Sequence, residues 1–340
     1  MKRKEKVKKD KWFMTLLIID ILAIICFFIV YGPFDFFRSY WITTSMKTQT
    51  HQYLAYIFYS DSMIEEVMSE NYVANFKDKT VDTSQIIFKD PSEVTEYSSI
   101  YEEQVLKKDE NNDLYKLVNI EHNGINGYLL VVYDPSRLSL VNAKYLASGG
   151  QHLSGLCKSY KAIAGINASG FISNSETYAM RPMGTIIQEG KITSLSSKNG
   201  KGDSLIGFNY DNVLVLTYED AETAVANGMR DALSFGPFLI MNGEAAFIRG
   251  NGGWGYRPRT AIGQRKDGIV LLLVMDGIKS GTGASVIDLT EIMMNYGAYN
   301  AANLDGGGSC TMVVNNEVIN NPGGWSYRGE RSIPNAWILK

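Results

Sequence analysis

Cysteine and histidine are both scarce in this sequence, with three residues of each among 340. Cys26, Cys157 and Cys310 form no CxxC pair and no Cys/His spacing typical of a zinc site, which excludes a disulfide-rich scaffold and a zinc finger. The sequence leaves open whether Cys157 and Cys310 form a disulfide or lie apart as small core residues. The few histidines and the lack of a GxSxG elbow argue against a Ser-His-Asp hydrolase.

Familiar phosphate-binding motifs are also missing. The glycine run Gly306-Gly307-Gly308, followed by Ser309, is neither GxGxxG nor a Walker loop, so the sequence predicts no dinucleotide or P-loop site. Its backbone N–H groups could still face an anion. Beyond residue 11 the chain carries 26 basic and 34 acidic residues, and we therefore expect no nucleic-acid partner.

Basic residues instead gather at the N-terminus, where seven Lys and Arg fall within the first 11 residues. The stretch Trp12 to Tyr31 follows, with Asp20 as its one acid, and it has about the length of a membrane-spanning helix. No small-residue cleavage site comes next. We therefore expect a cytoplasmic tail at 1–11, an uncleaved anchor in membrane lipid at 12–32, and an extracytoplasmic remainder.

Residues 33–114 are polar with loose helical periodicity, and we predict a partly helical stalk or linker. From residue 115 to 340 the pattern changes to short apolar strands separated by turns such as Asn-Gly at 123–124 and Asp-Gly at 267–268. A well-marked helix follows Ser285, with a capping box to Asp288 and a glycine stop at Gly297. The fold class is α+β: a strand-rich mixed-sheet domain with packed helices after one transmembrane helix.

Candidate site residues lie where predicted strands end or glycine loops begin. The strand that ends near Ile166 delivers Asn167, and NLDGGGS places one carboxylate, Asp305, against three glycines. Acids and arginines occupy similar positions. The candidate acids are Asp276, Asp305 and Glu330, and the candidate cationic residues are Arg181, Arg257, Arg259 and Arg331.

Read together, the segments INASGF, RPMGTIIQEG, SFGP, RPRTAIG, VMDG, NLDGGGS and GERSIPNAWIL resemble the phosphodiester glycosidase family over roughly residues 118–340. The resemblance implies hydrolysis between the anomeric carbon of a sugar and phosphate, with N-acetylglucosamine as the sugar. Bacterial members are often described as exopolysaccharide proteins. The implied partner of an anchored domain is a cell-surface phosphoglycan or a teichoic acid-type polymer in the cell envelope.

The resemblance supports the candidate residues as a group and leaves their individual roles to chemistry. We expect Asp305 to be the principal carboxylate, with Glu330 or Asp276 as the second; the two remain unranked. The four arginines would bind the phosphate, and Asn167 would be a hydrogen-bonding partner of the substrate. Gly306, Gly307, Gly308 and Ser309 would let substrate approach the backbone. No obligatory cofactor is predicted, although Asp276, Asp305 and Asn303 are ligands that would suit calcium. A non-catalytic phosphoglycan-binding protein and a metal-dependent P–O phosphodiesterase remain the alternatives.

Overall fold

The computed structural model describes residues 2–48, 51–110, 112–144, 146–174, 176–195, 202–277, 282–324 and 327–340. The chain divides into two compact units. The first runs to Tyr72 and also includes Arg249–Gly255, and the second comprises Val73–Ile248 and Tyr256–Lys340. This boundary differs from the predicted one at residue 115, because residues 73–114 belong to the second unit.

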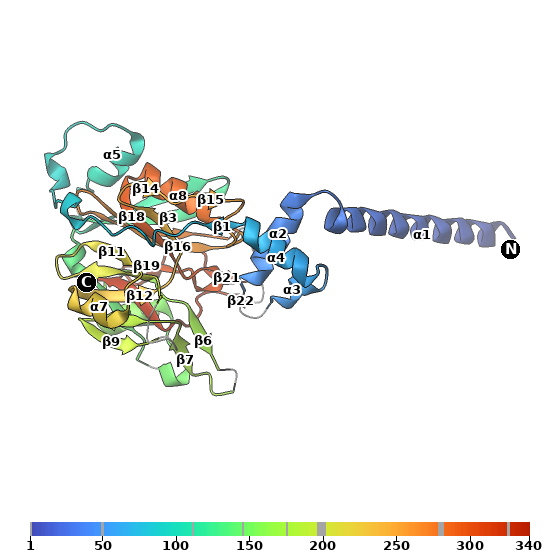
Figure 1. The fold of residues 1–340 in the computed structure, drawn as a ribbon. Coiled ribbons are helices and arrows are strands. Elements are labelled where there is room, and N and C mark those ends of the chain that lie inside the picture. The colour runs from blue at the N-terminus through green and yellow to red at the C-terminus, as the bar shows by residue number, and fades with distance from the viewer. Residues whose placement is uncertain are drawn as a thin grey trace. The chain divides into compact units, whose positions relative to one another are not determined.

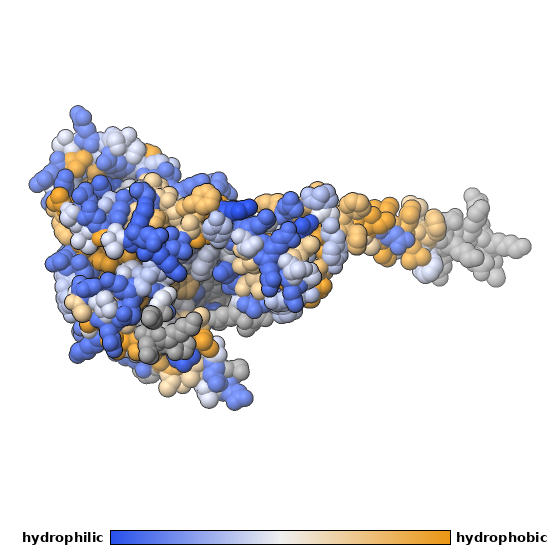
Figure 2. All heavy atoms as spheres, viewed as in Figure 1, coloured by the Kyte–Doolittle hydropathy of each residue, from blue (hydrophilic) through white to orange (hydrophobic). Residues whose placement is uncertain are grey.

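The first unit is helical. Its helix α1 (Lys2–Tyr31) contains the stretch Lys11–Tyr31, which has a mean hydropathy of 2.9 and is long and apolar enough to cross a membrane. Where Figure 2 colours this helix, most of its visible side chains are apolar. Three shorter helices follow and enclose a small core around Ile42 and Ala55. They are α2 (Asp35–Met46), α3 (Tyr53–Tyr56) and α4 (Asp61–Glu70).

The glycine-rich segment Arg249–Gly255 is held within this helical unit. The side-chain amide of Asn251 donates a hydrogen bond of 2.8 Å to Thr43 Oγ1, and its backbone N–H donates one of 2.9 Å to Asn71 Oδ1. A Cβ on Gly253 would lie 2.2 Å from the carbonyl oxygen of Asn71, so only glycine allows this approach. The chain then re-enters the second unit at Tyr256.

The second unit is built on antiparallel sheets (Figure 1). In the part of the chain that the structure describes, seven strands form the largest sheet. In spatial order they are β14 (Glu244–Ala245), β13 (Phe238–Met241), β18 (Ala298–Leu304), β16 (Arg259–Arg265), β17 (Val270–Met275), β3 (Ile125–Val132) and β2 (Tyr115–His122). A five-stranded sheet contains β20 (Glu317–Val318), β19 (Met312–Val314), β5 (Ala164–Asn167), β23 (Asn335–Leu339) and β4 (Leu138–Asn142).

A second five-stranded sheet and short pairs complete the strands. The sheet orders β11 (Leu214–Thr217), β10 (Leu205–Asn209), β12 (Met229–Ser234), β8 (Ile186–Gln188) and β9 (Lys191–Ser194). The pairs are β6 (Phe171–Ser173) with β7 (Met180–Pro182), β21 (Gly323–Gly324) with β22 (Tyr327–Arg328), and β1 (Tyr72–Val73) with β15 (Ile248–Arg249). The helices of this unit are α5 (Ile100–Leu106), α6 (Leu153–Tyr160), α7 (Ala221–Ala226) and α8 (Val286–Asn295).

One hydrophobic core joins the three larger sheets. It includes Leu272 from the seven-stranded sheet and Trp337 and Phe208 from the two others. The rings of Phe208 and Trp337 meet edge to face, with centroids 5.4 Å apart. The buried thiols Cys157 and Cys310 are free and lie in separate clusters. The predicted α+β class is therefore confirmed, and the two outer cysteines act as small core residues.

Local signals in the sequence explain the elements that were predicted. Asn123 and Gly124 adopt positive φ angles of 51° and 74° in the turn between β2 and β3, as an Asn-Gly hairpin requires. Helix α8 begins after Ser285, which forms the predicted capping box with Asp288, and Gly297 follows it at φ 78°. The turns and the helix were both predicted correctly because each depends on neighbouring residues alone.

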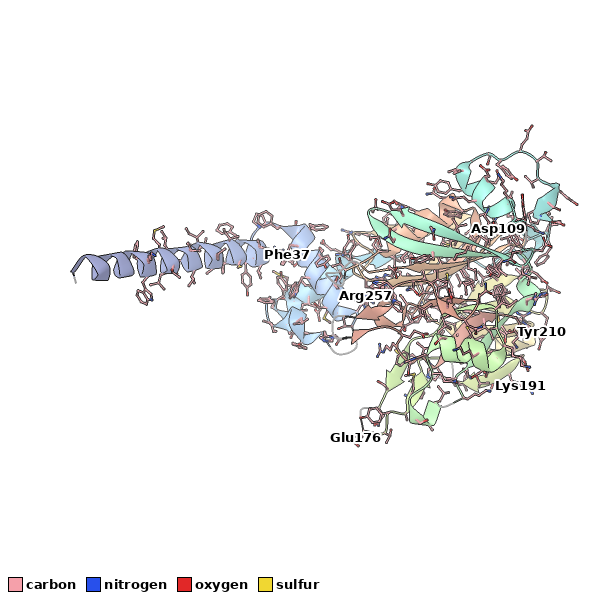
Figure 3. The ribbon with its side chains drawn as sticks, turned by 180° about the vertical axis from the view of Figure 1, so that it is seen from behind. Phe37, Asp109, Glu176, Lys191, Tyr210 and Arg257 are labelled. Atoms are coloured by element: carbon pink, nitrogen blue, oxygen red, sulfur yellow. The ribbon has the colours of Figure 1, made fainter. Side chains whose placement is uncertain are left out.

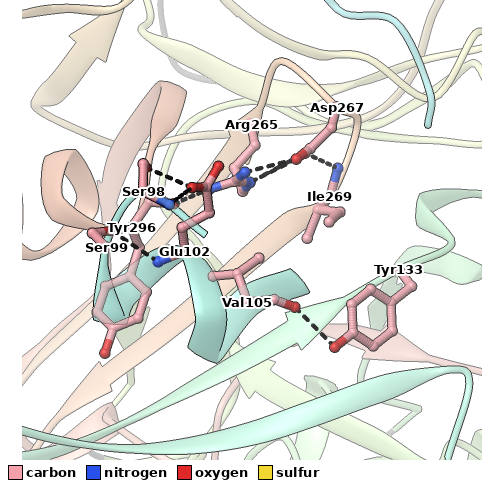
Figure 4. A network of polar contacts seen from close by, with 9 residues as sticks. All are labelled: Ser98, Ser99, Glu102, Val105, Tyr133, Arg265, Asp267, Ile269 and Tyr296. Carbon is pink, nitrogen blue, oxygen red and sulfur yellow. Dashed lines mark hydrogen bonds and ion pairs between the residues drawn. The ribbon is translucent and has the colours of Figure 1, made fainter. Parts of the chain in front are cut away.

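Residues 98–106, by contrast, are fixed by distant residues (Figure 4). The hydroxyl of Tyr133 donates a hydrogen bond of 3.0 Å to the carbonyl oxygen of Val105 at the end of α5. The hydroxyl of Tyr296 donates one of 2.7 Å to Gln104 Oε1. These contacts join α5 to the seven-stranded sheet and to the end of α8. They explain why residues 98–106 belong to the second unit.

Candidate functional site

Three neighbouring central strands of the seven-stranded sheet, β18, β16 and β17, bring charged residues to the same end of the sheet. In the antiparallel register, Thr260 opposes Leu304 and Arg259 opposes Met275. Asp305 and Asp276 each follow the last residue of their strand, so both lie at the end of the sheet where β16 begins. Two strand spacings separate β17 from β18, or about 10 Å at the backbone. Two of the three predicted acids, Asp276 and Asp305, thus lie at one end of this sheet without being adjacent.

Strand β5 of the first five-stranded sheet ends at Asn167, which contacts the backbone of Asp305. The side-chain amide of Asn167 donates a hydrogen bond of 2.7 Å to the carbonyl oxygen of Asp305. Its Oδ1 accepts bonds from Thr260 Oγ1 at 2.7 Å and from the backbone N–H of Thr311 at 3.2 Å. Asn167 is almost completely buried. Its contacts make it the residue that fixes the backbone around Asp305, a role that sequence reasoning did not assign to it.

The glycine run after Asp305 lets two loops pass close together. A Cβ on Gly306 would lie 2.9 Å from the carbonyl oxygen of Pro258, between the two arginines of the β16 entrance. Gly307 has φ 64°, and its N–H donates a bond of 2.8 Å to the same oxygen. Gly307–Ser309 then form the short 3-10 helix η5. The bare backbone therefore serves close packing against Pro258, and the N–H of Gly307 is directed to that residue.

Asp305 has an unusual ionisation. Burial of its carboxyl group among protein atoms raises its pKa to about 6, even though the residue keeps some exposure to solvent. The nearby Ser309 side chain, the charges of Arg331 and Arg257 and the N–H of Gly306 oppose this rise in pKa. A carboxylate that is ionised at neutral pH but close to titrating is suited to a reacting role.

Two arginines lie at the start of β16, and Figure 3 shows Arg257 at one end of the strands, opposite Tyr210 and Asp109. Burial lowers the pKa of both Arg257 and Arg259, and for Arg259 the charge of Arg257 lowers it further. Arg259 Nε donates a bond of 3.1 Å to the carbonyl oxygen of Ala284. The charges of Asp305 and Asp288 oppose the lowering at Arg259, and a cationic pair of this kind suits an anionic ligand.

Arg331 and Glu330 are neighbours in sequence with different surroundings. The Arg331 guanidinium stacks over the ring of Phe171 at 4.6 Å, and its charge lowers the pKa of Asp305. The Glu330 carboxylate accepts hydrogen bonds from the N–H of Ser154, at 2.8 Å, and from its hydroxyl. Glu330 therefore sits at the first turn of α6, where a carboxylate also stabilises the helix dipole.

Arg181 and Asp276 also have well-defined positions. Arg181 is exposed on β7, opposite Ile172 of β6, and lines a hollow of about 470 Å³ beside this hairpin. It is not among the groups that shift the pKa of Asp305. Asp276 Oδ1 accepts bonds from Asn320 Nδ2 at 2.9 Å and from the N–H of Asn321 at 3.1 Å, and burial raises its pKa. No motif in the sequence marks Asn320 as a partner of Asp276.

The predicted calcium ligands differ in their surroundings, and the Asn303 Oδ1 atom is buried without a hydrogen-bond partner among the residues that the structure describes. The Asn303 amide donates a bond of 2.7 Å to the carbonyl oxygen of Gly236, while the Asp276 carboxylate binds residues 320 and 321. The arginine charges near Asp305 oppose a cation at that carboxylate. Calcium at these residues stays a prediction.

Comparisons with known proteins point in one direction. A family model described as phosphodiester glycosidase matches residues 160–340, which include every candidate site residue. The SPbeta prophage-derived protein YomE of Bacillus subtilis (strain 168) is 29% identical over 175 residues, covering 49% of this chain and 26% of YomE. The N-acetylglucosamine-1-phosphodiester alpha-N-acetylglucosaminidase of Mus musculus is 27% identical over 172 residues, covering 46% and 32%.

A solved structure has the same fold. The catalytic domain of the zebrafish N-acetylglucosamine-1-phosphodiester alpha-N-acetylglucosaminidase, auto-inhibited by its pro-peptide, superposes with a TM-score of 0.56 at 21% identity. The match covers 68% of this chain and 85% of that one. The chain spans only about a quarter to a third of the length of the curated relatives it matches.

Proposed function

Because the chain belongs to the phosphodiester glycosidase family, we propose that it hydrolyses the bond between a sugar's anomeric carbon and phosphate. In this reaction water adds to the anomeric carbon, the C–O bond to phosphate breaks, and a free sugar and a phosphomonoester are released. N-acetylglucosamine is the sugar we propose, since the relative from Mus musculus is named for its action on an N-acetylglucosamine-1-phosphodiester.

The leaving group explains why one carboxylate can be central. In ordinary glycoside hydrolysis a carboxylic acid must protonate a poor alkoxide leaving group, while a second carboxylate attacks or activates water. A phosphomonoester has a second pKa near 6 and can leave at neutral pH with little protonation. Such a reaction needs cations around the phosphate and a carboxylate near the anomeric carbon.

The observation that carries the proposal is the concentration of arginine charge around Asp305. Arg257 and Arg331 both act electrostatically on the Asp305 carboxyl, and the buried Arg259 lies beside Arg257. We assign these three arginines to the phosphate of the substrate. Asp305 would face the anomeric carbon, either attacking it or stabilising the positive charge that develops there. Arg181 lies on the β6–β7 hairpin and would contact a more distant part of the substrate.

The second carboxylate is proposed between two residues with different support. Asp276 follows a strand that ends on the same side of the sheet as the strand before Asp305, which supports a shared role. The Glu330 carboxylate is engaged by Ser154 and the Asp276 carboxylate by Asn320 and Asn321, so either would have to exchange contacts to act as base or acid. We therefore favour Asp276 as the second carboxylate and Glu330 as a residue that positions its neighbour Arg331.

The proposed location follows from α1. Its apolar stretch Lys11–Tyr31 is preceded by a basic segment, which favours a single-pass anchor with a cytoplasmic N-terminus. The catalytic unit would then lie outside the cytoplasm, where a teichoic acid-type polymer or another surface phosphoglycan is the accessible substrate. Membrane lipid would contact only the anchor.

The test incubates the full chain, solubilised in detergent, with an N-acetylglucosamine α-1-phosphodiester and identifies the products by mass spectrometry. Free N-acetylglucosamine plus a phosphomonoester, lost in Asp305→Asn, is the expected result. Sugar 1-phosphate whose formation stops with a chelator would instead indicate a metal-dependent P–O phosphodiesterase. Binding without turnover would indicate a phosphoglycan-binding protein. If the chain shows no binding and no turnover, N-acetylglucosamine is rejected as the sugar.

A further inference from the structure

A further cluster of titratable side chains lies in the second unit, on β2 and α8. His122 ends strand β2, and Asp288 and Glu291 lie one turn apart on α8. His122 Nε2 is 3.4 Å from Asp288 Oδ1 and 3.1 Å from Glu291 Oε2. Among the residues that the structure describes, these three form a group whose ligand atoms all lie within 4.8 Å of one another.

The distances match those between ligands of one small metal ion. Zinc binds imidazole nitrogen and carboxylate oxygen at about 2.0–2.2 Å, so neighbouring ligand atoms of a tetrahedral site are about 3.3 Å apart. The two measured separations lie on either side of this value. A neutral imidazole and two carboxylates together carry two negative charges, which one divalent cation neutralises.

The middle ligand is held in place by neighbouring groups. Asp288 Oδ1 accepts a hydrogen bond of 2.7 Å from Asn123 Nδ2. Its other oxygen accepts bonds of 2.7 Å from the N–H and the hydroxyl of Ser285 in the capping box. Hydrogen bonds of this kind orient a carboxylate ligand before the metal arrives and raise metal affinity.

Solvent can reach the cluster for metal entry and for a further ligand. The Glu291 side chain is 54% exposed, and that of His122 is 21% exposed. His122 also lines a cavity of about 200 Å³ between α5, β2 and α8. This cavity has room for the water molecule that would complete four-coordination.

We propose that His122, Asp288 and Glu291 bind one Zn²⁺, with His122 Nε2 and one oxygen from each carboxylate as ligands. The ion would fasten the β2–β3 turn to the first turns of α8. Immediately before this helix, the carbonyl oxygen of Ala284 accepts bonds from the backbone N–H of Arg257 and from Arg259 Nε. The metal would therefore stabilise the segment that holds the two arginines, and its role is structural rather than catalytic.

The test titrates Zn²⁺ into the metal-free, detergent-solubilised full chain, using a chromophoric chelator as competitor, and records thermal unfolding in parallel. Wild type should bind one Zn²⁺ per chain, and its unfolding midpoint should rise with added metal. His122→Ala and Glu291→Gln should each lose at least tenfold in affinity and show a smaller rise. Glu291→Gln changes an exposed side chain, so loss of binding there cannot be attributed to misfolding.

His152→Ala is the matched control, because it removes an exposed histidine that lies outside this group. Its Zn²⁺ affinity should equal that of wild type. The proposal is overturned if wild type binds no Zn²⁺ at this stoichiometry, or if His122→Ala and Glu291→Gln bind it as wild type does. The first of these results would leave the cluster as a histidine–carboxylate ion pair.

Discussion

The side-chain amide of Asn167 donates a 2.7 Å hydrogen bond to the backbone carbonyl oxygen of Asp305. Asn167 ends a strand of the five-stranded sheet, and Asp305 follows a strand of the seven-stranded sheet. In the opposite direction, the N–H of Asp305 donates to the carbonyl oxygen of Ala168 at 3.1 Å. The position of the central carboxylate therefore depends on the junction between two sheets.

Replacing Asn167 should disturb catalysis more than substrate binding. In Asn167→Ala, the backbone carbonyl oxygen of Asp305 loses the hydrogen bond from Asn167. A displacement of the reacting carboxylate by about 1 Å can reduce a rate up to ~100-fold. We expect kcat to fall about 10- to 100-fold with little change in KM, measured by steady-state kinetics on the phosphodiester. Asn126→Ala, at an exposed position, should behave as wild type. An unchanged kcat in Asn167→Ala would show that this junction does not position the reacting group.

Activity should depend on pH through Asp305. Its pKa is raised to about 6, and the proposed role requires the ionised form. A phosphodiester substrate lacks the second ionisation of a monoester, so it keeps the same charge across this range. We expect kcat/KM to rise between pH 5 and pH 7 with an apparent pKa near 6. A profile that falls over this interval would mean that the essential form of Asp305 is the protonated one.

The same pKa predicts a stability effect. Because the folded-state pKa of Asp305 lies above its ordinary value of 3.8, the folded protein binds more protons than the unfolded chain between about pH 4 and 6. Ionising Asp305 thus lowers the free energy of unfolding as pH rises through this window, by at most about 3 kcal/mol. Asp305→Asn cannot ionise, so its unfolding midpoint relative to wild type should increase from pH 4 to pH 7.

Thermal unfolding of the two proteins across this range measures the effect, with Asp211→Asn as the control for loss of one exposed acidic charge. A constant difference between Asp305→Asn and wild type at all pH values would contradict the raised pKa.

Arg331 should act mainly on substrate affinity. Its guanidinium is held against Phe171 and is assigned to the substrate phosphate. A hydrogen-bonded charge pair of this kind contributes about 1.5–3 kcal/mol, so Arg331→Gln should raise KM about tenfold or more. Steady-state kinetics at several salt concentrations measure this change. Lys191→Ala removes an exposed cation that lies far from Arg257 in Figure 3, and it should leave KM unchanged. An equal rise of KM in both variants would indicate only long-range attraction.

Glu330 and Asp276 should separate structural from catalytic roles. Glu330→Gln weakens the charge-assisted contact with the N-terminus of α6 and should cost about 1 kcal/mol of unfolding free energy, measured in urea. We expect its kcat to stay within about tenfold of wild type, whereas Asp276→Asn should lower kcat by at least ~100-fold. The reverse order of the two kcat values would make Glu330 the second carboxylate.

Much of the fold could be predicted because its signals are local. A positive-φ turn needs residues such as Asn123 and Gly124, and a helix start needs a cap such as Ser285 with Asp288, all within a few positions. The candidate residues could be found in the same way, because Asp305 and Arg259 stand directly at strand ends.

The arrangement of the site was less predictable because it depends on distant contacts. Nothing local indicates that Asn167 reaches the backbone of Asp305, or that Asp276 binds the segment at Asn320. Adjacent Glu330 and Arg331 contact different residues, Ser154 and Phe171, which no local pattern indicates. Contacts of this kind also hold residues before the predicted boundary at 115, since Val105 accepts a hydrogen bond from Tyr133.

The bond that breaks tests the central claim most directly. Wild-type protein and Asp305→Asn would be incubated in ¹⁸O-labelled water with an N-acetylglucosamine α-1-phosphodiester, and the phosphomonoester product would be analysed by mass spectrometry. The phosphate is the reliable reporter because the free sugar exchanges its anomeric oxygen with water. Cleavage at the anomeric carbon predicts an unlabelled phosphomonoester, formed by wild type and lost in Asp305→Asn. An ¹⁸O-labelled phosphate product, or undiminished turnover in Asp305→Asn, would contradict the account.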